Sequence, residues 1–134
     1  MMILGIGSDL VSLERIERMA QQYGQRFYDR ILTNDEQHFL QKLDPKSQTP
    51  YIAKRFAGKE AVSKALGTGF SEGLSFKDIE ILNYKNGRPK VCLHGTAIDI
   101  LNRLSDGAKK TDIAITLTDE PPYAQAMVII STVS

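Results

Sequence analysis

Two patterns of apolar and polar residues run along this chain, and each is typical of one kind of secondary structure. Short apolar runs with period-two alternation predict strands, and apolar residues three or four positions apart predict helices. The predicted strands are Ile3–Gly7, Phe76–Tyr84, Lys90–Leu93, Ile113–Leu117 and Tyr123–Val133. The predicted helices run from Ser12 to Gly24, from Thr33 to before Pro45, from Thr49 to Leu66 and from Thr96 to Gly107. The segment Arg26–Leu32 has no clear assignment.

In chain order the elements read β-α-α-α-β-β-α-β-β. Short turns join neighbouring strands, with Asn86-Gly87 as a hairpin signal and Asp119–Pro122 as a second turn. Strands joined this way pair antiparallel, so the predicted fold class is α+β. At 134 residues, without a linker or repeat, the chain is expected to form one domain, 1–134.

Several residues predict where the elements begin and end. Ser12 is a predicted N-cap, and Thr33 with Glu36 forms a capping box. Thr49-Pro50 is a cap followed by proline and predicts the start of a helix that stops at Gly67. Two glycines before Asp9 predict a tight turn with room for a ligand, which would put Asp9 just past the end of the first strand.

The composition excludes several classes of protein. The net charge is +1, so there is no global attraction to nucleic acid or to a membrane surface. One cysteine cannot build a disulfide framework. No apolar run approaches the roughly 20 residues of a membrane span, and Met1–Gly5 does not resemble a signal peptide. We expect a cytoplasmic protein that binds neither nucleic acid nor membrane.

Two carboxylates are candidates for metal binding. Asp9 follows the first strand and Glu60 lies in the third predicted helix. Mg²⁺ prefers oxygen ligands and often takes one or two carboxylates, with substrate phosphates completing its shell. The spacing alone leaves the alternatives open: Asp9 also suits a turn, and Glu60 suits an ion pair with Lys64 four residues later.

Cations surround Glu60 along the same predicted helix. Lys54, Arg55, Lys59 and Lys64 lie on more than one of its faces, so some of them face solvent. Arg55 and Lys64 flank the Phe56–Glu60 face and are candidates for binding phosphate. Gly67-Thr68-Gly69 follows the helix, so a C-cap explains it better than a phosphate-binding loop at a helix N-terminus.

The N-terminal region has a local excess of positive charge. It forms either a solvated face or a docking surface for an acidic protein, and it contains Met19 and Phe27 interleaved with four arginines: Arg15, Arg18, Arg26 and Arg30.

Together these segments resemble the 4′-phosphopantetheinyl transferase family. Gly5–Val11 followed by Arg15-Ile16 is similar to the first motif of that family, and Arg55–Ala61 with Lys64-Ala65 is similar to the second. Gly67–Phe70 and Gly87-Arg88-Pro89 also match. The similarity covers essentially the whole chain, and the short length is similar to that of the family's short members.

The resemblance implies a reaction in fatty acid biosynthesis. Coenzyme A would donate 4′-phosphopantetheine to a serine of apo-acyl carrier protein, leaving adenosine 3′,5′-bisphosphate. Asp9 and Glu60 would bind Mg²⁺ with the pyrophosphate, and Lys64 would stabilise charge on the phosphates. Either Glu60 or a metal-bound water would take the serine proton.

The resemblance also implies how the substrates bind. The coenzyme would contact Arg55, Lys64, Gly67, Thr68, Gly69, Gly87, Arg88 and Pro89, and the acidic carrier would dock on Arg15, Met19, Arg26 and Arg30.

The short members are similar in forming homotrimers with active sites between subunits. That resemblance makes Ile113–Leu117 and Tyr123–Val133 the candidate interface strands.

Two positions depart from the family pattern. Ala114 stands where members often have a histidine. Gly58 lies inside a helix, where it either allows a ligand or neighbouring chain to approach or is a tolerated substitution. A non-catalytic module that binds a nucleotide or an acidic protein remains the alternative, and it would need the cations but not the two carboxylates.

Overall fold

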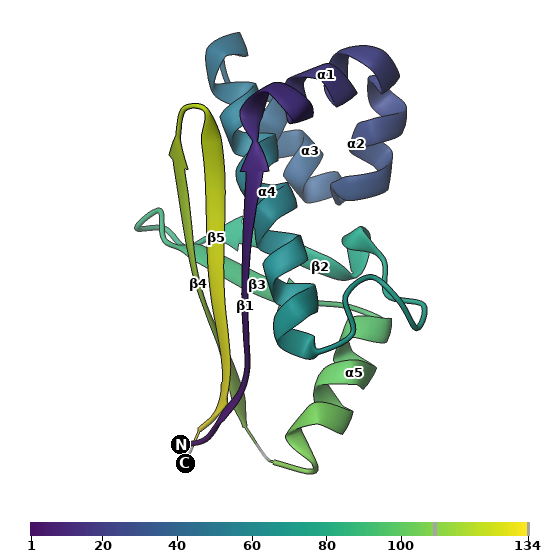
Figure 1. Cartoon of the computed structure of the whole chain (residues 1–134), viewed down its shortest axis with the longest axis vertical. Helices are drawn as coiled ribbons and strands as arrows, with labels where there is room; N and C mark the ends of the chain where they lie inside the picture. Colours follow the sequence, from purple (N-terminus) through teal and green to yellow (C-terminus); the bar gives the residue numbers. More distant parts are fainter. Residues whose placement is uncertain (109, 134) are drawn as a thin grey trace.

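The chain folds around one long helix that lies against an antiparallel sheet (Figure 1). The computed structural model describes residues 1–108 and 110–133. Its strands are β1 (Ile3–Ser12), β2 (Ile79–Asn83), β3 (Pro89–Leu93), β4 (Thr111–Glu120) and β5 (Tyr123–Thr132). Its helices are α1 (Leu13–Tyr23), α2 (Gln25–Ile31), α3 (Asn34–Gln41), α4 (Pro45–Leu66) and α5 (Thr96–Ser105), and a 3-10 turn, η1 (Phe76–Asp78), precedes β2.

The strands confirm the α+β prediction. One sheet has the order β1-β5-β4, and β2 and β3 form a separate hairpin; all pairs are antiparallel. Side chains of β4 alternate between half-buried and exposed, as the period-two pattern predicts. Helices α1 to α3 gather at one end of the molecule and α5 at the other, where the two termini lie close together (Figure 1).

Helix α4 is buried on nearly all sides, which explains why its sequence is not amphipathic. The three-stranded sheet covers one side of it, and the β2–β3 hairpin packs on another (Figure 1). Ala57, Ala61 and Val62 are fully buried along its length. A helix enclosed in this way needs apolar or small residues all round rather than one apolar stripe.

Gly5 and Gly7 do not form the predicted turn. Both lie inside β1, which continues through Asp9 to Ser12 and pairs with β5. A Cβ at Gly5 would lie 1.9 Å from the carbonyl oxygen of Ala65, and one at Gly7 would lie 1.9 Å from that of Ala61. The glycines are therefore needed for the close approach of α4 to β1.

The start of α4 also differs from the prediction. The helix begins at Pro45, because the Asp44 side chain accepts a hydrogen bond from the backbone N–H of Ser47 and caps it. Pro50 consequently lies inside the helix rather than at its start. Asp44-Pro45 and Thr49-Pro50 both have the cap-then-proline pattern, and the sequence reading chose the second.

Other local signals are confirmed, and one helix was missed. Ser12 caps α1, Thr33 and Glu36 form the capping box of α3, and Gly67 ends α4 in the left-handed conformation. The unassigned segment 26–32 largely forms α2, so the described residues form five α-helices where four were predicted. This helix has only seven residues, and it buries Phe27 and Ile31 on one side.

Gly58 serves packing inside this chain. A Cβ there would meet the side-chain ends of Ile81, Leu117 and Ile115, so neither a ligand nor a neighbouring chain explains the glycine. Among the described residues, no helix has the combination of length and apolar character that crossing a membrane requires.

Candidate active site

The close crossing of β1 and α4 brings together the three residues that the sequence assigned to chemistry. Asp9 lies on β1 opposite Ala126 of β5, and its side chain points to the α4 side of the sheet. The Lys64 ammonium lies 3.2 Å from the Asp9 carboxylate and donates to the Ser8 carbonyl at 3.0 Å. Residues 55 positions apart in sequence thus form an ion pair at the site.

Glu60 lies one helical turn before Lys64 and shares this environment. Partial burial raises the pKa of Glu60 above its ordinary value, and the negative charge of Asp9 raises it further. The positive charges of Lys64 and Arg15 act in the opposite direction on that pKa. The Asp9 and Glu60 carboxylates are therefore close enough to repel each other, and Lys64 and Arg15 are close enough to act against that repulsion.

Two neighbouring carboxylates fit a divalent cation. Within residues 1–108 and 110–133, no cluster of three or more His, Cys, Asp or Glu side chains could hold a metal. A metal bound by Asp9 and Glu60 would take its other ligands from water or from a substrate. That donor set fits Mg²⁺, which often keeps several waters and combines one or two carboxylates with substrate phosphates.

A groove opens beside Glu60. Its volume is about 490 Å³, and α1, α2, α4 and η1 supply its walls. The four predicted docking residues all line it: Arg15, Met19, Arg26 and Arg30. The structure thus joins the basic N-terminal surface to the carboxylate pair, which the sequence could not do.

Aromatic rings form the inner wall of this groove. Phe56 of α4 stacks on Phe76 of η1 with ring centroids 5.4 Å apart, and Phe76 stacks on Phe70 at 4.0 Å. The Arg15 guanidinium lies over the Phe56 ring at 5.7 Å. Phe70 follows Gly67-Thr68-Gly69 directly, so this stack connects that loop to α4. The sequence analysis placed Phe27 within the basic N-terminal region but missed the groove role of Phe76, because no local pattern relates Phe76 to Glu60.

Arg55 faces away from this groove. It is 5% exposed, donates hydrogen bonds to the Ile81 carbonyl and the Asn83 side chain, and lies over the Tyr51 ring. Its neighbours in a cavity of about 450 Å³ include Gly87 and Pro89. Arg55 therefore does not flank the Glu60 face, contrary to the sequence-based prediction.

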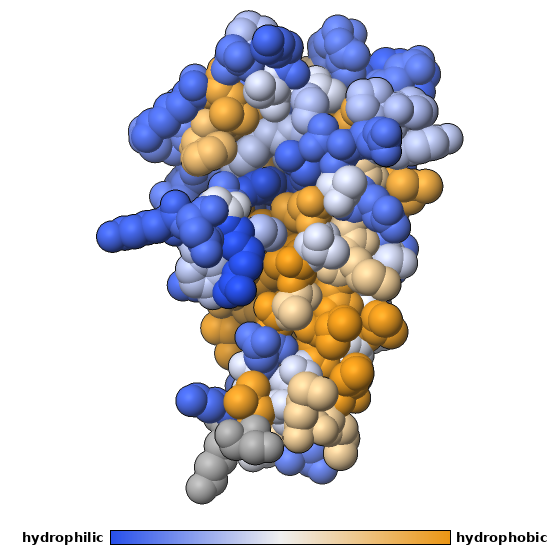
Figure 2. Space-filling view, turned by 90° about the vertical axis from the view of Figure 1, so that its left-hand side faces the viewer, coloured by the Kyte–Doolittle hydropathy of each residue, from blue (hydrophilic) through white to orange (hydrophobic). Residues whose placement is uncertain are grey.

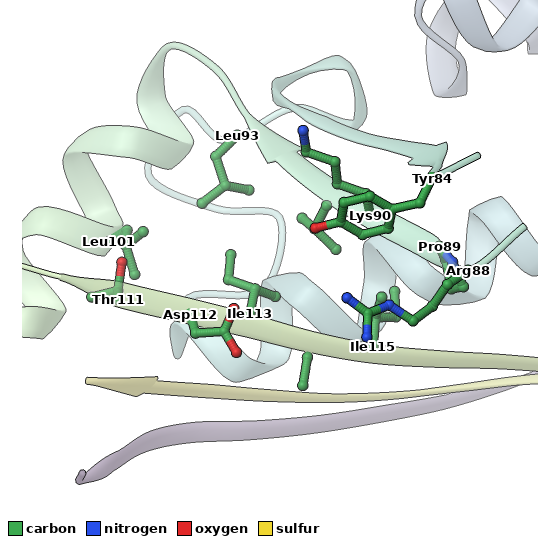
Figure 3. A pocket seen from close by; sticks show the side chains of 12 residues that line it. Tyr84, Arg88, Pro89, Lys90, Leu93, Leu101, Thr111, Asp112, Ile113 and Ile115 are labelled. Atoms are coloured by element: carbon green, nitrogen blue, oxygen red, sulfur yellow. The ribbon is translucent and has the colours of Figure 1, made fainter. Parts of the chain in front are cut away.

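Arg88 and Pro89 line a further cavity of about 390 Å³ between β3, α5 and β4 (Figure 3). The Arg88 guanidinium and the Lys90 ammonium both lie over the Tyr84 ring, and Ala114 lies in the same wall. Figure 1 shows this hairpin tip and the 67–75 loop on opposite sides of α4. The predicted coenzyme contacts thus fall into two groups within one chain. One group is Lys64 with Gly67, Thr68 and Gly69, and the other is Arg55 with Gly87, Arg88 and Pro89.

Comparison with known proteins shows the family of this chain. A sequence model described as the 4′-phosphopantetheinyl transferase superfamily matches residues 5–118. This chain belongs to that superfamily. The matched range includes both carboxylates, Lys64 and every predicted docking residue.

Individual relatives cover almost the whole chain. Holo-[acyl-carrier-protein] synthase from Methylorubrum populi is 44% identical over 133 residues, which is 98% of this chain and 96% of that protein. The enzyme of the same name from Orientia tsutsugamushi is 44% identical over 130 residues, covering 97% and 98%.

Solved structures of this superfamily share the fold. The crystal structure of holo-[acyl-carrier-protein] synthase from Neisseria meningitidis superposes with a TM-score of 0.84 at 36% identity, covering 98% of this chain and all of that one (100%). The Bacillus anthracis enzyme, solved in complex with CoA (3′,5′-ADP), gives 0.81 at 32% identity, covering 99% and 100%.

Proposed function

We propose that this protein transfers the 4′-phosphopantetheine group of coenzyme A to a serine hydroxyl of an apo-acyl carrier protein. A bond forms between the serine oxygen and the phosphorus that carries the pantetheine arm. The bond from that phosphorus to the bridging oxygen breaks, and adenosine 3′,5′-bisphosphate leaves. We place the reaction in fatty acid biosynthesis, as the resemblance implies.

One observation carries the proposal: Asp9, Glu60 and Lys64 meet at the edge of a groove with a basic rim. Two carboxylates beside a lysine suit a magnesium pyrophosphate, and the basic rim suits an acidic carrier. The full-length similarity to relatives named holo-[acyl-carrier-protein] synthase supports the same reaction.

The residues would divide the work as follows. Asp9 and Glu60 would bind Mg²⁺, which when bound neutralises negative charge on the pyrophosphate. Lys64 is half-exposed and would contact the phosphates, where its charge stabilises the negative charge that develops on the leaving group. Glu60 or a water on the metal would accept the serine proton.

The first test is transfer itself. The purified protein is incubated with coenzyme A, Mg²⁺ and an apo-acyl carrier protein, and the intact mass of the carrier is measured. We expect the carrier to gain one phosphopantetheine group, and to gain none when EDTA replaces Mg²⁺. A folded protein that binds the carrier without modifying it would instead support the alternative, a non-catalytic binding module.

The second test separates the two carboxylates from general effects of charge. Glu60→Gln and Asp9→Asn should each lower transfer by about a hundredfold or more, because each removes one metal ligand. Asp99→Asn is the matched control, since Asp99 is an exposed carboxylate on α5. Circular dichroism checks that all three variants fold. Full activity of Glu60→Gln would reject the assignment of Glu60.

We further propose that the active protein is a homotrimer with each coenzyme site between two subunits. The two groups of predicted coenzyme contacts lie on opposite sides of α4, and a site shared between two subunits would bring one group from each chain to the same coenzyme molecule. A neighbouring subunit that presents its Gly87-Arg88-Pro89 turn would complete the site.

The outer face of the three-stranded sheet supports such assembly. An apolar stripe runs down this face (Figure 2). Ile6 and Leu10 of β1 are 61% and 59% exposed, and Tyr123 and Met127 of β5 are 49% and 45% exposed. Ile113, Ile115 and Leu117 of β4 pack on the core, so the outward-facing side chains of the two predicted interface strands are those of β5 and the alternate positions of β4. Large exposed apolar patches often mark interfaces.

Light scattering on a sizing column tests the assembly. Met127→Glu places a charge in the stripe and should yield monomers that have lost transfer activity. Ile98→Glu is the control, because Ile98 on α5 is 44% exposed but lies outside the stripe. A monomeric wild-type protein with full activity would refute the shared site.

A further inference from the structure

Lys59, the residue immediately before Glu60, is completely buried. Among the fully buried side chains of the described residues, that of Lys59 is the largest by volume, and its ammonium lies between helices. Burying a charge is costly unless partners replace the lost water. The sequence reading counted Lys59 only among the cations of the helix, so the burial requires a separate explanation.

The Lys59 ammonium has two short contacts. It donates to the Ile31 carbonyl at 2.6 Å and to the Glu36 carboxylate at 2.6 Å. Glu36 in turn accepts hydrogen bonds from the backbone N–H groups of Thr33 and Ile81, each at 2.8 Å. This network connects four elements: the end of α2, the start of α3, α4 and β2.

The contact to Ile31 concerns the groove directly. Ile31 is the last residue of α2, and α2 supplies Arg26, Phe27 and Arg30 to the groove wall. The helix is only seven residues long, and no side chain caps its N-terminus at Gly24. A helix this short has little stability of its own, so its position depends on tertiary contacts.

Lys59 and Glu60 are consecutive on α4, and they serve different partners. Glu60 lines the groove, whereas Lys59 points into the core and binds the end of α2. The distance between the carboxylate and the α2 wall therefore depends on a hydrogen bond made by the adjacent residue.

We propose that Lys59 is a positioning residue that fixes α2, and with it the basic wall of the groove, relative to Glu60. The proposal rests on the proposed function, because it assigns the wall to carrier binding. Lys59 does not touch a substrate. It acts by donating to the Ile31 carbonyl, and its pairing with Glu36 makes the buried charge tolerable.

Three variants separate positioning from stability. Lys59→Met removes the donor to Ile31 and leaves Glu36 unpaired. Lys59→Met with Glu36→Gln also removes the donor but leaves no unpaired charge. Glu36→Gln alone retains Lys59 and its hydrogen bond to the Ile31 carbonyl. All three remove the buried ion pair, but only the first two release α2.

We expect KM for the apo-carrier to rise about tenfold in both variants that lack the lysine, because α2 loses the internal hydrogen bond from a charged donor that holds the basic wall in place. KM for coenzyme A should stay within about twofold. Glu36→Gln should keep the wild-type KM for the carrier, although its melting temperature falls. If Lys59→Met does not fold, comparing the double variant with Glu36→Gln still shows whether the lysine positions α2.

Hydrogen exchange followed by mass spectrometry gives a second readout that needs no activity. Amides of residues 25–31 should lose protection in both variants that lack the lysine and keep it in Glu36→Gln. Recovery of both stability and carrier KM in the double variant would overturn the proposal, as would unchanged exchange in α2. If the wild-type protein transfers nothing, the proposed function fails, and the exchange experiment still tests the attachment of α2.

Discussion

Gly7→Ala tests the close crossing of β1 and α4. The new Cβ would lie 1.9 Å from the Ala61 carbonyl oxygen and 2.9 Å from the Ala65 backbone nitrogen. Contacts between such atoms are optimal near 3.5 Å, so α4 or β1 must move by roughly 1.5 Å. Both neighbours are backbone atoms of a buried helix, so they cannot rotate away. We expect a loss of about 3 kcal/mol in the free energy of unfolding, the upper end for an overpacked core.

The matched control is the same substitution in α4. Gly58→Ala would place a Cβ 2.5 Å from the Ile81 Cδ1 and 3.2 Å from the Leu117 Cδ2, which are ends of flexible side chains. Replacing a helical glycine by alanine gains about 1 kcal/mol, which offsets this repacking. Gly58→Ala should therefore stay within about 1 kcal/mol of the wild-type stability.

Urea unfolding followed by circular dichroism, at equal protein concentrations, measures the difference. The Gly7→Ala midpoint should lie well below that of Gly58→Ala, and its melting temperature should be roughly 10 °C lower than that of the wild type. Asp9 lies two residues from Gly7, so its distance to Lys64 changes with the crossing. Transfer per folded molecule should fall about a hundredfold. Equal midpoints for the two variants would refute the argument from close approach.

Three further variants test local features. Burial raises the pKa of Tyr51 from 10.0 to about 12, so between these values the folded state keeps a proton that the unfolded state has lost. Stability should therefore fall by about 1.4 kcal/mol between about pH 9 and about pH 11, and Tyr51→Phe should lack this fall when urea midpoints at the two pH values are compared. Asp44→Ala removes the N-cap of α4, whose side chain accepts a 3.1 Å hydrogen bond from the Ser47 N–H, and should lower the free energy of unfolding by about 1 kcal/mol. An unchanged melting temperature would contradict this. Lys54→Met removes a partly exposed ion pair to Asp119 and should cost less than about 1 kcal/mol in urea unfolding, so a larger loss would show that the pair matters more than its exposure implies.

Local signals in the sequence determined much of the secondary structure. The Ser12 cap, the Thr33–Glu36 capping box and the Gly67 stop are all present, because each depends on hydrogen bonds or backbone angles within a few residues. The α+β class also followed from alternation and turn residues. The two family motifs predicted Asp9, Glu60 and Lys64 as a set, and the crossing of β1 and α4 brings them together.

Only the tertiary structure decided what the glycines and buried charges do. Gly5 and Gly7 suit a turn as well as a close crossing, and nothing near them in sequence identifies Ala61 and Ala65 as their neighbours. In sequence Lys59 is one of several lysines along the helix and does not differ from those that face solvent, yet its ammonium binds the Ile31 carbonyl and the Glu36 carboxylate in the core. A local pattern specifies how a segment folds, whereas contacts between segments far apart in sequence depend on how all the elements pack.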